Sequence, residues 1–154
     1  MTLTDLMDHL ADFIKPVITE YVTKQGGAVI PLSVYAGYPP QEKEHNSFIY
    51  VLVTDVDDDP DDNMSTAKVQ IGFSIYDDDK KSNGRCLFNL VEHVRQHLLQ
   101  HRTVADEHRL ILPLKFNLAE RPWPQWQAIL TATYTIGQPC EEVFYDEQET
   151  ISTY

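Results

Sequence analysis

The hydrophobic period of this chain changes once within residues 66–102, and this change constrains the fold more than any other feature. Over the first part, apolar residues alternate with polar ones: Val69, Ile71, Phe73 and Ile75. This alternation is typical of a strand with one buried face. After a polar loop at residues 77–83, the apolar residues recur at intervals of three and four: Leu87, Leu90, Val91, Val94, Leu98 and Leu99. That spacing predicts an amphipathic helix. A strand and a helix that each have a single apolar face must pack against something, most simply each other.

A second helix is predicted near the start of the chain, where an apolar stripe covers residues 3–22. Thr2 and Asp5 have the spacing of a capping box. Pro16 lies inside the stripe and lacks an amide hydrogen, so we expect a kink or a break near Lys15. For the later helix, Ser82 or Asn83 is the expected cap.

Further strands are predicted at residues 28–36, 48–53, 110–118 and 126–136. Pro31 favours an edge position for the first of them. Together with the two helices they predict an α+β fold, with a mostly antiparallel sheet of about five strands packed against two helices. We expect a single domain over residues 1–137 and an acidic, mobile C-terminal tail over residues 138–154.

The charge of the chain excludes some classes of function. There are 24 acidic and 12 basic residues, which gives a formal charge of −12 and opposes nonspecific binding to nucleic acid. No apolar run is long enough to cross a membrane, and the N-terminus lacks the basic start of a secretory signal. The two cysteines are too few for a disulfide framework, so we expect a reducing compartment.

Acidic residues are concentrated at residues 55–62 and 77–79, which we interpret as solvated loops. The first of these stretches resembles a calcium-binding loop only in part. Starting from Asp55, the sixth position is Pro60 where glycine is needed, and the twelfth is Thr66 where glutamate is needed.

His93, His97 and His101 lie on one face of the predicted helix at intervals of four residues. Histidines with this spacing can bind a transition metal, so these three are weak candidates for metal ligands. A solvated polar face explains them as well, since Asn89 and Gln96 are their neighbours.

Trp123 and Trp126 flank a proline-rich turn. Such a turn can be a binding hot spot, but the indoles can equally close the end of the core, and Trp126 starts the apolar face of the last strand. The sequence contains no nucleophile elbow and no phosphate-binding loop, and Cys86 favours packing over reactivity. For want of a nucleophile or a ligand set, an enzyme ranks last among the functions that we consider.

Residues 48–136 contain four stretches in order: FIYVLV with the acidic loop after it, KVQIGFSIYDDD leading into NGRCLFNLVEHVRQHLLQH, LILPLKFNLAE, and RPWPQW leading into QAILTATYTI. Together, in this order and spacing, they resemble the phage tail terminators, also called tail completion or minor tail proteins. No functional residue of the family is carried over by position.

The resemblance implies a structural protein that assembles into a ring, usually a hexamer. It implies no enzyme activity and no cofactor. Such a ring caps the tail tube, ends its polymerisation and presents a surface to the head connector. The implied partners are further copies of the chain, the major tail tube protein and the head–tail connector protein, with DNA only passing through the lumen. The implied location is the virion tail, and the host cytoplasm during assembly.

Two sets of residues are our candidates for assembly contacts. The acidic residues are expected to face the lumen or the tube, and the tryptophans to meet a partner: Asp57, Asp58, Asp59, Asp61, Asp62, Asp77, Asp78, Asp79, Trp123 and Trp126. The alternative function is a small metal-binding or protein-binding module that uses the histidine face or the tryptophan turn.

Overall fold

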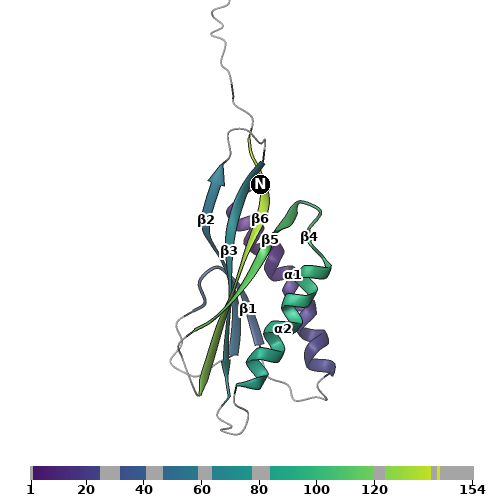
Figure 1. Cartoon of the computed structure of the whole chain (residues 1–154), viewed down its shortest axis with the longest axis vertical. Coiled ribbons are helices and arrows are strands. Elements are labelled where there is room, and N and C mark those ends of the chain that lie inside the picture. Colours follow the sequence, from purple (N-terminus) through teal and green to yellow (C-terminus); the bar gives the residue numbers. More distant parts are fainter. Residues whose placement is uncertain are drawn as a thin grey trace, which may run out of the picture.

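The computed structural model describes residues 2–24, 32–40, 47–58, 64–77, 84–119, 124–139 and 142. Two helices lie on one face of a six-stranded sheet (Figure 1). In chain order the elements are α1 (Leu3–Lys24), β1 (Leu32–Ala36), β2 (Ser47–Asp58), β3 (Met64–Tyr76), α2 (Arg85–Gln100), β4 (Thr103–Val104), β5 (His108–Leu118) and β6 (Gln125–Gly137).

The strand order in the sheet is β1-β2-β3-β6-β5-β4. β1 pairs with β2 in parallel, and all other neighbours are antiparallel. The predicted α+β fold is therefore confirmed, with the short β4 as an additional strand. β1 lies at a sheet edge, as Pro31 predicted.

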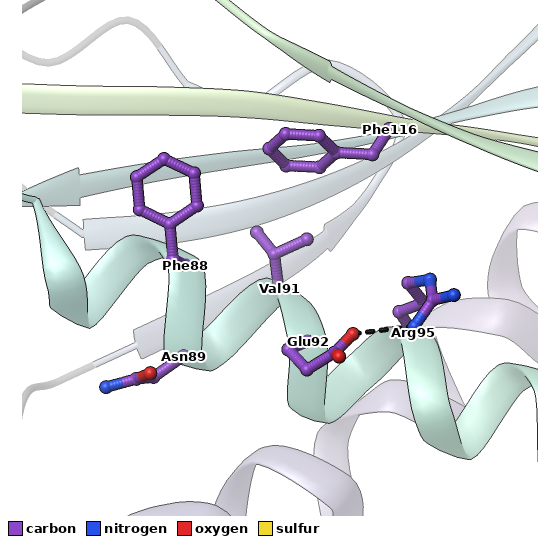
Figure 2. Close-up of a pocket in the computed structure, with 6 residues that line it drawn as sticks. All are labelled: Phe88, Asn89, Val91, Glu92, Arg95 and Phe116. Atoms are coloured by element: carbon purple, nitrogen blue, oxygen red, sulfur yellow. Dashed lines mark hydrogen bonds and ion pairs between the residues drawn. The ribbon is translucent and has the colours of Figure 1, made fainter.

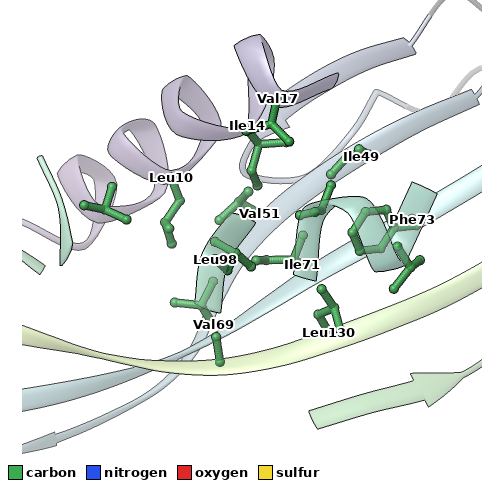
Figure 3. Packing of buried hydrophobic residues seen from close by; sticks show 14 of the residues in the cluster. Leu10, Ile14, Val17, Ile49, Val51, Val69, Ile71, Phe73, Leu98 and Leu130 are labelled. Atoms are coloured by element: carbon green, nitrogen blue, oxygen red, sulfur yellow. The ribbon is translucent and has the colours of Figure 1, made fainter. Parts of the chain in front are cut away.

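The core lies between the sheet and the helices, and it contains the alternating residues of the strands and the apolar stripes of both helices (Figure 3). Ile71 of β3, Leu130 of β6 and Leu98 of α2 are each 0% exposed. The two periods within residues 66–102 thus predicted correctly which sides of β3 and α2 are buried. Among the described helices, none is long and apolar enough to cross a membrane.

The first turn of α1 is closed by the predicted capping box. The Thr2 amide donates to Asp5 Oδ2 at 3.0 Å, and the Asp5 amide donates to Thr2 Oγ1 at 3.1 Å. The hydrogen bond from the Thr2 amide, and then one from the Thr2 side chain, stabilise the charged carboxylate, so the pKa of Asp5 lies below its ordinary value. Of the kink or break expected near Lys15, the break is absent, because α1 continues through Pro16 as one helix. Pro16 is exposed and costs the helix one hydrogen bond without ending it.

The acidic loop between β2 and β3 is shorter than predicted. β2 continues past a register shift between Val53 and Asp55, and its residues as far as Asp58 pair with β3. Asp57 and Asp58 are therefore strand residues, because pairing with β3 outweighs the low strand propensity of aspartate. Asp59, Asp61 and Asp62 lie outside the described residues.

α2 begins after Gly84. Gly84 is the N-cap, with a φ of 74°, and no side-chain cap hydrogen bond is present among the described residues. Ser82 and Asn83, the predicted caps, lie outside the described residues. A Cβ at Gly84 would come within 2.9 Å of the Trp126 ring, so both the backbone conformation and the close packing require glycine here.

β6 ends at Gly137. Of the predicted acidic tail at residues 138–154, only residues 138, 139 and 142 are described. The domain boundary and the mobility of this tail therefore stay predictions.

Candidate functional site

The second half of β5 is an unpaired edge of the described sheet. β4 pairs only with His108 and Arg109, and the Leu110 amide donates to the Arg102 carbonyl at 2.7 Å. β6 pairs with the opposite side of β5. Over residues 111–118, no described strand pairs with the outer side of β5, so its backbone groups there can pair with an added strand.

This edge carries apolar side chains that the fold leaves uncovered. Four of them are more than a third exposed: Ile111 at 39%, Leu112 at 48%, Phe116 at 40% and Leu118 at 57%. The alternation in residues 110–118 predicted one covered face, but the structure buries only Leu110 and half-buries Leu114. The reason is the position of the helices: α2 packs on β3 and β6, and α1 packs on β1, β2 and β4.

A groove lies where α2 faces this edge. Its volume is about 470 Å³, and Figure 2 shows the six residues that line it: Phe88, Asn89, Val91, Glu92, Arg95 and Phe116. The rings of Phe88 and Phe116 have centroids 6.1 Å apart. Phe88 is 46% exposed. Arg95 Nη1 donates to Glu92 Oε1 at 2.8 Å on the helix side of the groove. The groove therefore joins an apolar floor to a charged rim, as protein–protein contact sites do.

A second free edge lies on the opposite side of the sheet, in the second half of β2. β1 pairs with β2 only as far as Val51. No described strand covers the outer side of β2 at residues 52–58, where residues 54–58 are all exposed. Asp55, Asp57 and Asp58 make this edge acidic, although Asp58 accepts a hydrogen bond from the Ser65 hydroxyl. In contrast, Arg109 and Lys115 give β5 two cationic side chains.

The two free edges have opposite strand directions. β2 is antiparallel to β3, β3 to β6, and β6 to β5, so β2 and β5 run in opposite directions. β1 covers one half of the β2 edge, and β4 covers one half of the β5 edge. The two halves that stay free lie at opposite ends of the sheet, measured along its strands. A copy shifted along the strands could therefore pair its free β2 with the free β5 of its neighbour in antiparallel register.

Asp77 and Trp126 belong to the joint between β3, α2 and β6. Trp126 Nε1 donates to the Asp77 carbonyl at 3.2 Å, and the Asp77 amide donates to the Pro124 carbonyl at 2.9 Å. The Cys86 thiol donates to Asp77 Oδ2 at 3.3 Å. Burial, and then the neighbouring Asp77 carboxylate, raises the pKa of Cys86 to about 11. Trp126 thus packs at the end of the core, and Cys86 is held as a thiol, as its sequence position predicted.

Three further candidate contact residues lie close to Asp77 and Trp126 in the sequence. Trp123, Asp78 and Asp79 lie outside the described residues, so their roles as contact residues stay predictions.

Two histidines of α2 make helix contacts. His93 Nε2 lies 3.1 Å from the Val17 carbonyl of α1, and His97 Nδ1 lies 3.0 Å from the His93 carbonyl. The His101 ring lies edge-on to Phe13, with centroids 6.2 Å apart. These contacts give the histidine face a role in packing α2 against α1. Its role as a metal site stays a prediction.

A different group could hold a metal ion. In the described part of the chain, the group of three potential ligands whose atoms all lie within 4.8 Å of one another is His9, Glu107 and His108. Sequence reasoning missed this group, because His9 and His108 are 99 residues apart and have no recognisable spacing.

Comparisons with known proteins add little to this description. Neither a scan against protein families nor a search of curated proteins finds a match to this chain. A search of solved structures finds similar chains, among them a protein whose name describes no function. It is 12% identical, covers 84% of this chain and 97% of its own, and has a TM-score of 0.41. A likeness at this level carries no argument about function.

Proposed function

We propose that this chain is a structural subunit of a phage or prophage tail, a tail terminator that assembles into a ring. The ring caps the tail tube, ends its polymerisation and provides the surface to which the head connector binds. The proposal is supported by the resemblance of residues 48–136 to tail terminators. The structural observation that carries it is the free edge of β5, with its exposed apolar side chains beside the groove at Phe88 and Phe116.

The ring contact joins the free half of β5 in one copy to the free half of β2 in the next. Main-chain hydrogen bonds between the two strands continue the sheet across the interface. Lys115 on one side attracts Asp55 and Asp57 on the other, and these charges fix the direction of assembly. The two patches differ, so the interface is head-to-tail, and head-to-tail contacts that close generate rings.

The acidic residues give the ring a passage that does not hold DNA. With a formal charge of −12, the chain repels phosphate, which suits a lumen through which DNA only passes. We expect Asp59, Asp61 and Asp62 at the mouth of the lumen or against the tube. The partners are further copies in a hexamer, the major tube protein and the connector, in the virion tail and, during assembly, in the host cytoplasm.

Deleting the gene from the phage or prophage that encodes it tests the function. Electron microscopy of the particles should show overlong tubes without heads, because nothing stops polymerisation. Complementation by the intact gene should restore a uniform tail length. Tails of normal length with heads attached, in the deletion strain, contradict the proposal.

The Leu118→Asp variant tests the interface separately from the function. Leu118 is 57% exposed, so the substitution leaves the monomer folded but places a charge in the proposed contact. Leu3→Asp is the matched control, because Leu3 is 40% exposed at the start of α1, where a negative charge is tolerated. Negative-stain images of the protein with tube should show rings on tube ends for the control and none for Leu118→Asp. Rings with both variants would contradict the β5 contact.

A charge exchange tests which strand lies opposite β5. Lys115→Glu should weaken ring formation, and Lys115→Glu combined with Asp57→Lys should restore it. One exposed ion pair contributes only about 0.2–1 kcal/mol, but the effect is repeated at every interface of the ring. If the double variant forms rings no more readily than Lys115→Glu alone, that result contradicts pairing between β5 and β2.

A further inference from the structure

His9, Glu107 and His108 converge from two distant parts of the chain. His9 lies on α1, while Glu107 and His108 lie at the turn between β4 and β5. His9 Nδ1 lies 3.0 Å from His108 Nε2 and 3.6 Å from Glu107 Oε2, and His108 Nε2 lies 3.9 Å from the same carboxylate oxygen. Two imidazole nitrogens and one carboxylate oxygen therefore face a common point.

The three distances fit one kind of metal ion. The point equidistant from three atoms with these separations lies about 2.0 Å from each, within the bond-length range of zinc to nitrogen and oxygen ligands. Calcium needs longer bonds, of about 2.3–2.6 Å, and six or more oxygen ligands. Magnesium also prefers oxygen, so the ligand set favours zinc over both.

His108 has the environment of a metal ligand. Its side chain is 0% exposed, and its Nδ1 lies 3.3 Å from the Thr135 carbonyl on β6. A carbonyl can only accept, so Nδ1 donates its hydrogen and Nε2 keeps the lone pair. In an imidazole that binds zinc through one ring nitrogen, the other ring nitrogen usually donates its hydrogen to a carbonyl or carboxylate. The buried lone pair of Nε2 points to His9 and Glu107.

The remaining side of the cluster is open. The side chain of His9 is 32% exposed and that of Glu107 is 45% exposed, so solvent reaches the cluster from their side. Zinc prefers four ligands in a tetrahedral arrangement, and water can supply the fourth here.

We propose that His9, Glu107 and His108 form a zinc site that holds α1 against the turn between β4 and β5. The ion joins a helix to the end of the sheet where β4 covers β5, away from the free half of the β5 edge. This site is independent of the tail function and of the α2 histidines. Zinc bound there stabilises the folded chain, because the unfolded chain cannot bring together ligands so distant in the sequence.

The test uses untagged full-length protein, freed of metal with a chelator and then dialysed against zinc sulfate. Elemental analysis should find one zinc ion per chain, and cobalt should give the visible absorption of a tetrahedral complex. Saturating zinc should raise Tm by about 5 °C. In His9→Ala and in Glu107→Gln, zinc affinity should fall at least about tenfold and the Tm shift should disappear. Both residues are partly exposed, so circular dichroism can verify that the metal-free variants fold like the metal-free wild type.

His97→Ala is the matched control, since it removes a histidine from α2 and leaves the proposed site intact. It should bind zinc as the wild type does. Zinc binding that is lost in His97→Ala and kept in His9→Ala assigns the metal to α2 and overturns the proposal. The proposal is equally overturned if the wild type binds no zinc, because His9 and His108 then form only a hydrogen bond to each other.

Discussion

Replacing Tyr134 with phenylalanine should make the protein more stable. The Tyr134 side chain is 0% exposed, on the core side of β6, and its buried hydroxyl has no hydrogen-bond partner among the described residues. An unsatisfied buried polar group costs about 1–3 kcal/mol, and phenylalanine keeps the ring while removing that group. The small space left by the oxygen offsets part of this, so we expect a net gain of about 1 kcal/mol.

Urea unfolding followed by circular dichroism measures the gain. At an m value of about 2 kcal/mol per molar urea, 1 kcal/mol raises the midpoint by about 0.5 M. The matched control is Tyr50→Phe, because the Tyr50 hydroxyl accepts a hydrogen bond from Gln70 Nε2 at 3.0 Å. That variant should lose about 0.5–1.5 kcal/mol. A Tyr134→Phe protein that is less stable than the wild type refutes the reasoning, since its hydroxyl must then have a partner such as a buried water.

The two proteins should also differ at alkaline pH. Burial raises the pKa of Tyr134 above its ordinary value of 10.0. The folded state therefore holds the phenol proton more tightly than the unfolded state does. The contribution of this proton to stability is complete below pH 10 and is lost as the pH rises further, by up to about 1.4 kcal/mol per pH unit. The advantage of Tyr134→Phe over the wild type should grow above pH 10, while the effect of Cys86, whose pKa is raised to about 11, cancels between them.

Two further substitutions test packing and thiol chemistry. Gly72→Ala should lower the free energy of unfolding by about 1–3 kcal/mol, because its Cβ would overlap the ring of Tyr50 directly across the strands. Urea unfolding measures this, and an equal loss in a Tyr50→Ala background contradicts the explanation. Cys86, with a pKa near 11 in place of 9.0, should be alkylated by iodoacetamide far more slowly than a free thiol, since about a hundredfold less thiolate is present at pH 8. The rate is measured in a Cys140→Ser background, and a rate equal to that of a cysteine peptide contradicts the raised pKa of Cys86.

The elements of this fold were predictable because their patterns are local. Val69, Ile71 and Phe73 alternate within one strand, and Leu87 and Leu98 share one side of one helix, so neither pattern depends on the rest of the chain. The position of β1 at an edge followed in the same way from Pro31.

The extent of the strands was less predictable, because it depends on their partners. Asp55, Asp57 and Asp58 have low strand propensity, and only pairing with β3 shows that β2 continues through them. The alternation in β5 indicated that the strand has two different faces. It could not indicate that Phe116 and Leu118 stay more than a third exposed, since that depends on where α2 packs.

The candidate sites were predictable only where they are local in sequence. His93 and His97 were visible as a helical pair, but the structure uses them in contacts with α1 and within α2. The group of His9, Glu107 and His108 depends on α1 packing against the β4–β5 turn, and no spacing within the sequence encodes that contact.

The free edge of β5 has features that limit which strands can pair with it. Pro113 has no amide to donate, and the register of β5 on β6 shifts between Ile111 and Lys115, so the edge is not a straight ladder. Lys115 adds a charge that a random apolar strand cannot neutralise. An added strand must therefore tolerate the irregular backbone and supply acidic residues. The free half of β2, which is irregular between Val53 and Asp55 and carries three aspartates, meets both requirements. The features that protect β5 from indiscriminate pairing thus support the proposed contact with another copy of the same chain.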